Sequence, residues 1–249
     1  MVTKTGGARD PHTNYKTSKY CVAYLDVLGG KDIIRNDNNN EHLNTLNMIF
    51  RDAISDVENT NLFSNDKFFV KIFSDNIILA VKIDEEDKIE NKIEKIGDLV
   101  VLINNIVEEI LNYGYLIRGA IVEGDFFCDN IFVYGKALID VVELEEKYAI
   151  YPRIIAQESI QQLLPHCFYK DIDGWNVLNT LLINDHGFLM SSFKESLKNL
   201  LKKNKDNKKA LQKIMWAINY FNDYNSWKKL NKMSDYCFIS NEEISDALK

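Results

Sequence analysis

The chain has 249 residues, of which 46% are hydrophobic, enough to build one full α/β core with a helical appendage. Its 30 basic and 37 acidic residues give a formal charge of −7, which disfavours a broad DNA- or RNA-binding surface but allows a small anionic ligand held by metal. Four scattered cysteines indicate reduced thiols, and no stretch approaches the roughly 18 apolar residues of a membrane helix. We therefore expect a cytoplasmic protein with no membrane partner.

The first elements are a strand and an amphipathic helix. Residues 1–19 lack apolar periodicity, and we expect them to form a flexible arm. Residues 20–27 (YCVAYLDV) predict a short apolar strand that runs into the turn residues Gly29 and Gly30. Apolar residues at helical spacing then predict a helix over 41–58 that covers a sheet.

A hairpin with an acidic tip follows. The β-rich runs 68–73 and 77–81 are separated by three residues, with Asp75 in the middle. A charged and apolar pattern of period 3.6 predicts a second long helix over 85–112, and residues 115–123 predict a third strong strand. Further short elements are expected in the ranges 130–134 (strand), 135–148 (helix), 152–156 (strand), 158–164 (helix), 167–183 (possible strands), 188–203 (helix) and 208–223 (helix).

This order of elements favours an α+β sandwich with a ferredoxin-like or palm-like core, an antiparallel-rich sheet flanked by helices. We expect a catalytic domain over residues 20–185 and a C-terminal helical extension over 186–249. The charged run 202–209 is typical of a solvated turn between two helices.

Two carboxylates at strand ends are the strongest candidates for chemistry. Asp26 ends an apolar strand, where an uncompensated charge would cost several kcal/mol, and Asp75 stands at the hairpin tip. Each could instead be a cap or a turn residue. If they converge, they can hold two hard divalent cations beside a triphosphate, and oxygen ligands favour Mg²⁺ or Mn²⁺.

Other polar residues fall within apolar runs or glycine turns. Arg118 interrupts an apolar strand and needs an anionic partner, in either a structural ion pair or a phosphate site. Tyr24 shares a strand face with Asp26, and Lys71 points either into a pocket or to solvent. The backbone at Gly29 and Gly30 could approach a phosphate.

Four segments resemble the ordered landmarks of class III adenylate and guanylate cyclases: YLDVLGG (24–30), FSDN (73–76), RGAIVEG (118–124) and VYGKALIDVVELE (133–145). The resemblance covers residues 20–165. It implies that Asp26 and Asp75 bind two metal ions with the backbone carbonyl of Val27. It also implies that Leu28, Gly29 and Gly30 lie near the phosphates.

The chain departs from that family where purine recognition is concerned. The base-reading lysine position keeps Lys71, but Phe132 stands at the base-reading aspartate position, and Ile139 and Glu143 stand at the transition-state asparagine and arginine positions. The two transition-state roles are therefore either empty in this chain or taken by Arg118, Lys136 or Arg153. Phe132 suits a base pocket without an acidic purine contact, or is a core phenylalanine.

With YPRII (151–155), DGW (173–175) and WAINYFNDYN (216–225), the pattern is similar to the pyrimidine cyclases of bacterial Pycsar antiphage systems. That resemblance implies conversion of UTP or CTP to cyclic UMP or cyclic CMP, a homodimer with shared sites, and a separate cyclic-nucleotide-activated effector. The alternatives are a catalytically inactive cyclase-like module that binds a nucleotide or a partner, and a purine (ATP or GTP) cyclase.

Overall fold

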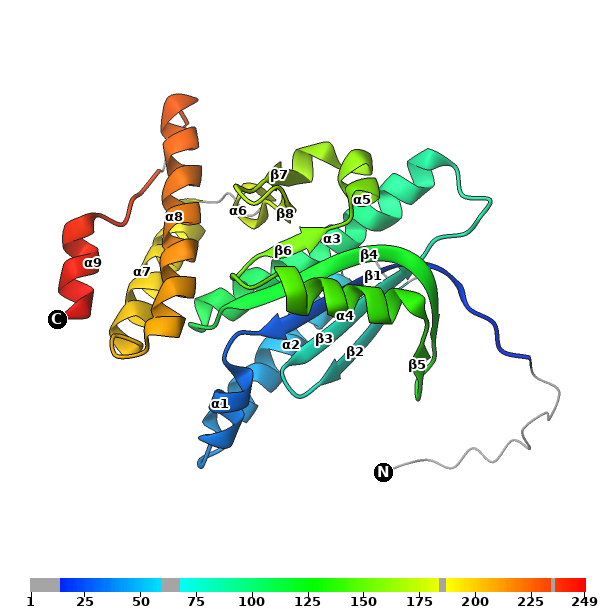
Figure 1. Cartoon of the computed structure of the whole chain (residues 1–249), viewed down its shortest axis with the longest axis horizontal. Coiled ribbons are helices and arrows are strands. Elements are labelled where there is room, and N and C mark those ends of the chain that lie inside the picture. Colours follow the sequence, from blue (N-terminus) through cyan, green and yellow to red (C-terminus); the bar gives the residue numbers. More distant parts are fainter. Residues whose placement is uncertain (1–13, 60–67, 184–186, 234–235) are drawn as a thin grey trace.

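The computed structural model describes residues 14–59, 68–183, 187–233 and 236–249. Within these ranges eight strands form one sheet, in the order β2-β3-β1-β4-β6-β8-β7, with β5 paired to β4 alone. The bounds are β1 Ser18–Val27, β2 Phe68–Phe73, β3 Asn76–Lys82, β4 Ile117–Cys128, β5 Val133–Tyr134, β6 Ile154–Ala156, β7 Phe168–Lys170 and β8 Asn176–Leu178. Figure 1 shows β1 and β4 crossing the middle of the molecule.

The four long strands are antiparallel neighbours, because β1 pairs with both β3 and β4, and β2 pairs with β3. This is the strand order of a ferredoxin-like core, and the predicted α+β class is confirmed. Among the strand pairs of the described residues, only β4 and β6 are parallel.

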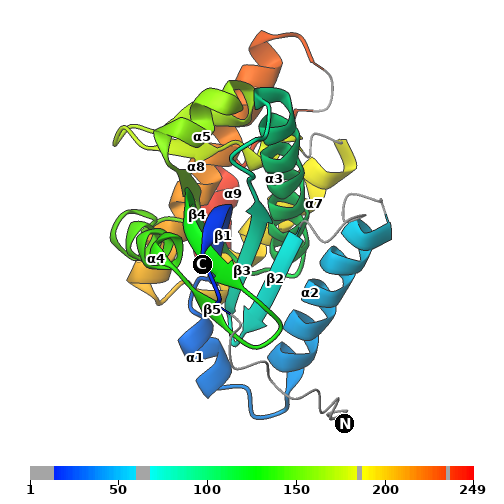
Figure 2. The same ribbon diagram turned by 90° about the vertical axis from the view of Figure 1, so that its right-hand side faces the viewer.

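Helices cover both faces of the sheet, as Figure 2 shows with α4 on one side and α2 and α3 on the other. The helices of the first part are α1 Gly30–Arg35, α2 Glu41–Asn59, α3 Ile89–Asn112, α4 Lys136–Tyr148 and α5 Glu158–Leu163. Alternate β1 residues explain the two layers: Cys21, Ala23, Leu25 and Val27 pack in the cluster with α2 and α3, whereas Val22 packs in the cluster with α4.

The end of α3 sets where β4 begins. The amide of Gly114 donates to the Leu111 carbonyl and that of Tyr115 to the Ile110 carbonyl, the paired bonds of a Schellman motif. Gly114 has φ +78, which residues with a side chain rarely adopt. The chain therefore reverses at once and enters β4, on which Arg118 lies.

A third apolar cluster joins the C-terminal helices. The 3₁₀ turn Pro165–Cys167 and α6 Thr180–Ile183 lead into α7 Gly187–Lys203, α8 Lys208–Leu230 and α9 Asn241–Leu248. Buried Phe193, Leu197, Ile218 and Phe221 lie in this cluster, and Leu111 of α3 packs against it. We propose that α7, α8 and α9 form the C-terminal extension expected over residues 186–249.

Several predicted bounds need correction. Strand β4 continues to Cys128, five residues beyond the predicted end, and β5 has two residues instead of five. Helix α3 starts at Ile89, because residues 84–88 form a turn in which Asp87 accepts from the Asp84 amide. Ser18 and Lys19 belong to β1 and not to the expected arm, whose residues 1–13 lie outside the described ranges. Helix α9 was not predicted.

Within the described residues, no helix is both long and apolar enough to cross a membrane.

Candidate active site

Asp26 lies near the end of β1, opposite Asn76 in β3 and Arg118 in β4. It shares the α4 face of the sheet with Tyr24, two residues earlier. Burial raises the pKa of Asp26, the positive charge of Arg118 lowers it, and the negative charge of Asp75 raises it. The two predicted carboxylates are therefore close enough to interact.

Asp75 lies in the tight turn between β2 and β3, after Ser74 with φ +58. Its carbonyl accepts a 3.1 Å hydrogen bond from the Val27 amide, which fastens the hairpin tip to the end of β1. The residue is only 7% exposed, and its Oδ1 accepts from the Asn76 side-chain amide at 3.2 Å. The structure thus places Asp75, in the β2–β3 turn, beside the end of β1 that carries Asp26.

Gly30 provides the space that the Asp75 carboxylate occupies. A Cβ added at Gly30 would lie 1.8 Å from Asp75 Oδ2 and 2.5 Å from its Cγ, far inside van der Waals contact. The sequence suggested that the glycines make room for a phosphate. Gly30 makes room for a carboxylate of the protein itself.

We expect Gly30→Ala to displace the Asp75 side chain, to lower the free energy of unfolding by about 1–3 kcal/mol and to weaken any activity that needs this carboxylate. Urea unfolding measures the change in the free energy of unfolding, and metal affinity measures the effect on the function of the carboxylate. Gly97→Ala in α3 is the matched control, because nothing lies within 4 Å of its added Cβ. That change should stabilise the helix by up to about 1 kcal/mol. Equal stability of the two variants would show that Gly30 is not tightly packed.

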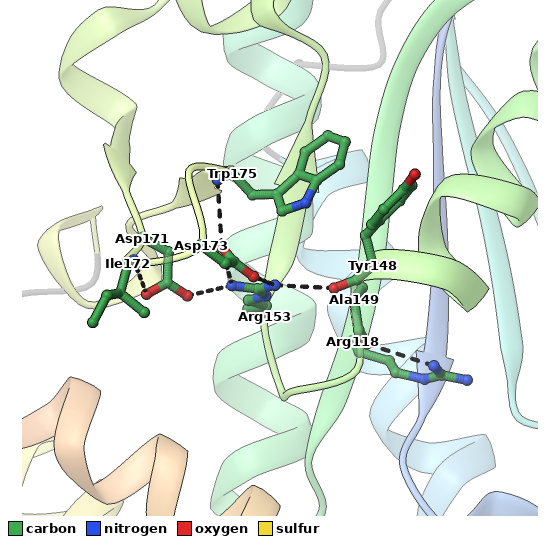
Figure 3. Close-up of polar contacts among 8 residues, drawn as sticks. All are labelled: Arg118, Tyr148, Ala149, Arg153, Asp171, Ile172, Asp173 and Trp175. Carbon is green, nitrogen blue, oxygen red and sulfur yellow. Dashed lines mark hydrogen bonds and ion pairs between the residues drawn. The ribbon is translucent and has the colours of Figure 1, made fainter.

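Arg118 joins Asp26 to a third acidic residue. Its Nε donates to Asp26 Oδ2 at 3.0 Å and lies 2.7 Å from Glu145 Oε1. Within the described residues, its Nη1 makes only a long 3.5 Å bond to the Ala149 carbonyl, drawn in Figure 3. The expected anionic partner of Arg118 is therefore present, as an ion-paired cluster of two carboxylates and one guanidinium.

Glu145 is a residue of this cluster that the sequence reasoning missed. It is 1% exposed, and burial raises its pKa to about 7 despite the positive charge of Arg118. A signal was available: Glu145 follows buried Ala137 and Val141 at four-residue spacing, on the face of α4 that packs on the sheet. An acidic residue on an apolar helix face indicates a buried polar contact.

The raised pKa of Glu145 predicts a pH-dependent stability. The folded state binds the Glu145 proton more tightly than the unfolded chain does. The contribution of Glu145 to the free energy of unfolding is therefore greatest at low pH and falls as the pH rises toward 7. We expect Glu145→Gln to remove this fall, which amounts to about 2–3 kcal/mol. Urea unfolding of both proteins between pH 5 and 8 provides the measurement. Parallel stability profiles would contradict the assignment.

Lys213 of α8 is a positive charge from the C-terminal helices that interacts with Asp26, Arg118 and Glu145. Burial lowers its pKa, and so does Arg118, whereas Asp26 and Glu145 raise it. It makes no hydrogen bond or ion pair with another residue in the described part of the chain. Sequence patterns gave no signal for it, because only the docking of α8 brings it near the cluster.

Two of the residues proposed to contact the nucleotide, Tyr24 and Lys71, lie on the same sheet face as Asp26. Tyr24 donates from its hydroxyl to the Asn76 side chain, beside the hairpin tip, and burial raises its pKa to about 12. Lys71 of β2 donates from Nζ to the Asn130 carbonyl at 3.0 Å. Phe132 is 55% exposed and stacks on Tyr134 beyond β4, so it is not the core phenylalanine of the alternative interpretation.

One backbone prediction is wrong, for the Leu28 amide, whereas the predicted roles of the Val27 carbonyl and Lys136 stay predictions. The Leu28 amide donates to the Leu116 carbonyl at 2.8 Å and is therefore not free for a phosphate, contrary to the expectation. Val27 is buried at the end of β1, with its amide on the Asp75 carbonyl. Lys136 is exposed at the start of α4, with no hydrogen bond to another described residue.

Arg153 is held in a separate, buried network, which Figure 3 shows. Its guanidinium bonds both Asp171 and Asp173, and its Nη2 donates to the Tyr148 carbonyl at 3.0 Å. The side chain is 1% exposed. The geometry therefore gives Arg153 a structural role in place of the expected nucleotide contact, because its Nη donors are already used.

No protein-family model matches the sequence, and a search of curated proteins finds no match. Among solved structures, the fold is similar to the monomeric guanylyl cyclase domain of the RhoGC fusion protein from the aquatic fungus Blastocladiella emersonii. The identity is 12%, 66% of this chain and 96% of that chain are covered, and the TM-score is 0.52. The chain has the fold of a class III cyclase domain.

Two other cyclase structures align at similar coverage. The guanylate cyclase domain of RhGC from Catenaria anguillulae is 12% identical, with 66% of this chain and 96% of that chain covered and a TM-score of 0.49. The adenylyl cyclase CyaB from P. aeruginosa is 12% identical, with 66% and 95% covered and a TM-score of 0.47.

Within this cyclase fold, the carboxylates fit a divalent cation. The buried Asp75 carboxylate has an amide partner but no ion pair with another described residue, so its charge lacks compensation. Among the described residues no three His, Cys, Asp or Glu side chains form a metal cluster. Two carboxylates suffice for Mg²⁺, which commonly takes its remaining ligands from phosphates and water.

Proposed function

We propose that this chain is a metal-dependent nucleotidyl cyclase, which converts a nucleoside triphosphate to its 3′,5′-cyclic monophosphate and pyrophosphate. The observation that supports this most is the meeting of Asp26 and Asp75 at the end of β1 and the tip of the β2–β3 hairpin, within a cyclase fold. Neither residue is needed to build the sheet, yet both place negative charge in a partly buried position.

Asp26 and Asp75, with the backbone carbonyl of Val27, would hold two Mn²⁺ or Mg²⁺ ions. Bound at these oxygens, such ions neutralise phosphate charge and lower the pKa of the ribose 3′-hydroxyl. The 3′-hydroxyl gives up its proton to water, its oxygen forms a bond to the α-phosphorus, and the bond from that phosphorus to the bridging oxygen breaks, so pyrophosphate leaves. The protein positions the reacting groups for this in-line displacement.

Arg118 is the residue that we propose for charge stabilisation. Its Nε is engaged by Asp26 and Glu145, which fix the guanidinium beside the carboxylate. Among the residues that the structure describes, its Nη1 has only the long bond to the Ala149 carbonyl. The outer nitrogens are thus available to donate to departing phosphate oxygens, the task that arginine commonly performs in phosphoryl transfer.

The proposed substrate is a pyrimidine nucleotide, UTP or CTP. Support comes from the resemblance to Pycsar pyrimidine cyclases and from Phe132, an exposed aromatic in place of an acidic purine contact. Lys71 and Tyr24 lie on the sheet face that would carry the base. We further propose that the product, cyclic UMP or cyclic CMP, acts as a second messenger on a separate effector in antiviral defence.

A homodimer with shared sites is part of the proposal. The β4–β5 arm exposes a group of apolar side chains that a folded monomer leaves in water: Ile131 is 82% exposed, Phe132 55% and Tyr134 62%. Contiguous exposed apolar surface favours burial against a partner. A second copy covering this arm would carry Phe132 to a shared pocket, as the resemblance implies.

The test is incubation with ATP, GTP, CTP or UTP and Mn²⁺ at several protein concentrations, followed by chromatography. Cyclic UMP or cyclic CMP together with pyrophosphate is the expected product, and specific activity should rise with protein concentration if the sites are shared. Cyclic AMP or cyclic GMP alone would identify a purine cyclase. No product from any nucleotide, with retained nucleotide binding, would establish the inactive binding module, which the missing asparagine and arginine at Ile139 and Glu143 favour.

A further inference from the structure

A cavity lies between α8, strand β7 with the loop that follows it, and the residues Asn179 and Leu182. Neither Asp26 nor Asp75 lines it. Its volume is about 750 Å³. Helix α8 contributes Trp216, Tyr220, Asp223 and Trp227, spaced so that they lie along one side of the helix. Trp216, Tyr220 and Asp223 belong to the segment WAINYFNDYN (216–225), and Trp227 follows it. The proposed cyclase chemistry does not use these residues.

Aromatic rings make up much of the wall of this cavity. Tyr220 stacks on Trp216 with centroids 5.6 Å apart and on Tyr169 of β7 at 5.5 Å. Farther along α8, Trp227 stacks on Tyr224 at 5.8 Å and is 45% exposed. Because the face of an aromatic ring carries negative partial charge, such a wall attracts cations.

The charged groups that line the cavity are Asp171, Asp223 and Lys170. Asp223 is exposed and makes no ion pair with another residue of the described ranges. Asp171 is bound by Arg153, and its Oδ1 accepts from the Ile172 amide at 2.8 Å. Burial raises the pKa of the Tyr169 hydroxyl, and the charges of Asp171 and Asp223 raise it further, so both carboxylates act on the interior of the cavity.

Charge complementarity selects between ligand classes. A nucleotide could stack on the rings, but its phosphates would meet the Asp223 carboxylate, and Lys170 is the only cationic side chain among the described lining residues. An ammonium or guanidinium group gains from both the ring faces and the Asp223 carboxylate. We propose that this cavity is a binding site for a small organic cation, with the exposed ring of Trp227 as its main aromatic contact and Asp223 as its counter-charge.

Calorimetric titration of the whole chain tests the proposal, with spermidine, arginine methyl ester and tetramethylammonium as probes. The titrations are run in 150 mM NaCl, where general attraction to a chain of charge −7 is largely screened. We expect saturable binding of at least one probe at one site. Tetramethylammonium binding would indicate a ring-dominated contact, and arginine methyl ester binding alone a planar guanidinium site.

Variants connect the binding to the cavity. Asp223→Asn should weaken binding by about tenfold, the effect of losing a partly desolvated charge partner, and Trp227→Leu should weaken it as well. Asp206→Asn, an exposed change on the turn before α8, is the matched control and should leave binding unchanged. Absence of saturable binding at probe concentrations up to about 10 mM would overturn the proposal, and so would equal weakening by Asp206→Asn. So would tighter binding of UMP than of any cation.

Discussion

Asp75→Asn is expected to abolish cyclisation while leaving the fold intact. The variant keeps the shape and the amide contact of the residue but removes the negative charge that we assign to metal binding. Because the metal contributes several kcal/mol of charge stabilisation, turnover should fall by about 1000-fold. The measurement is the rate of cyclic nucleotide formation at saturating Mn²⁺.

Stability separates this loss from unfolding. The Asp75 carboxylate is buried without an ion pair among the described residues, so its neutral replacement should melt at the same temperature or higher. Asp140→Asn, an exposed change on α4, is the control and should retain full activity. Retained turnover in Asp75→Asn at saturating metal would remove Asp75 from the mechanism, whereas a large drop in melting temperature would make its role structural.

The sequence predicted the central fold because its signals are local. The helix over 41–58, the strand 68–73 and the hairpin with Asp75 at its tip follow from periodicity and spacing, and the structure has them within one residue at each end. Helix α9 was missed although its signal is local too: Ser240 and Glu243 form a capping box. Strand β5 was overestimated, because Asp129 turns the chain by binding the amides of Ile131 and Phe132.

The candidate site was predictable only in part, for a physical reason. Asp26 and Asp75 stand at strand ends whose pairing follows from the fold, so their convergence could be expected. Glu145 required attention to the packed face of α4, and Lys213 depends on how α8 docks, which no local pattern specifies. Arg153 looked like a nucleotide contact because its partners lie 18 and 20 residues later, in a loop without regular structure.

The network around Arg153 provides the prediction with the largest expected effect on stability. Its side chain is 1% exposed and binds Asp171, Asp173 and the Tyr148 carbonyl, connecting the end of α4 to the β7–β8 loop (Figure 3). Arg153→Met removes the charge but keeps most of the volume. It leaves Asp171, whose side chain is 13% exposed, without its cation. We expect a loss of about 3–5 kcal/mol, as for other buried ion pairs that lose one partner.

Urea unfolding at pH 7 measures this loss, with Arg51→Met as the control, because Arg51 is exposed and bonds only the Asn47 side chain among the described residues. Arg153→Lys should fail to restore stability, since one ammonium group cannot replace the planar fork that binds two carboxylates. The bond from Arg153 also lowers the pKa of Asp173, so the wild-type advantage should shrink as the pH falls through that lowered pKa. A lysine variant as stable as the wild type would show that charge alone, without the bidentate geometry, holds the loop.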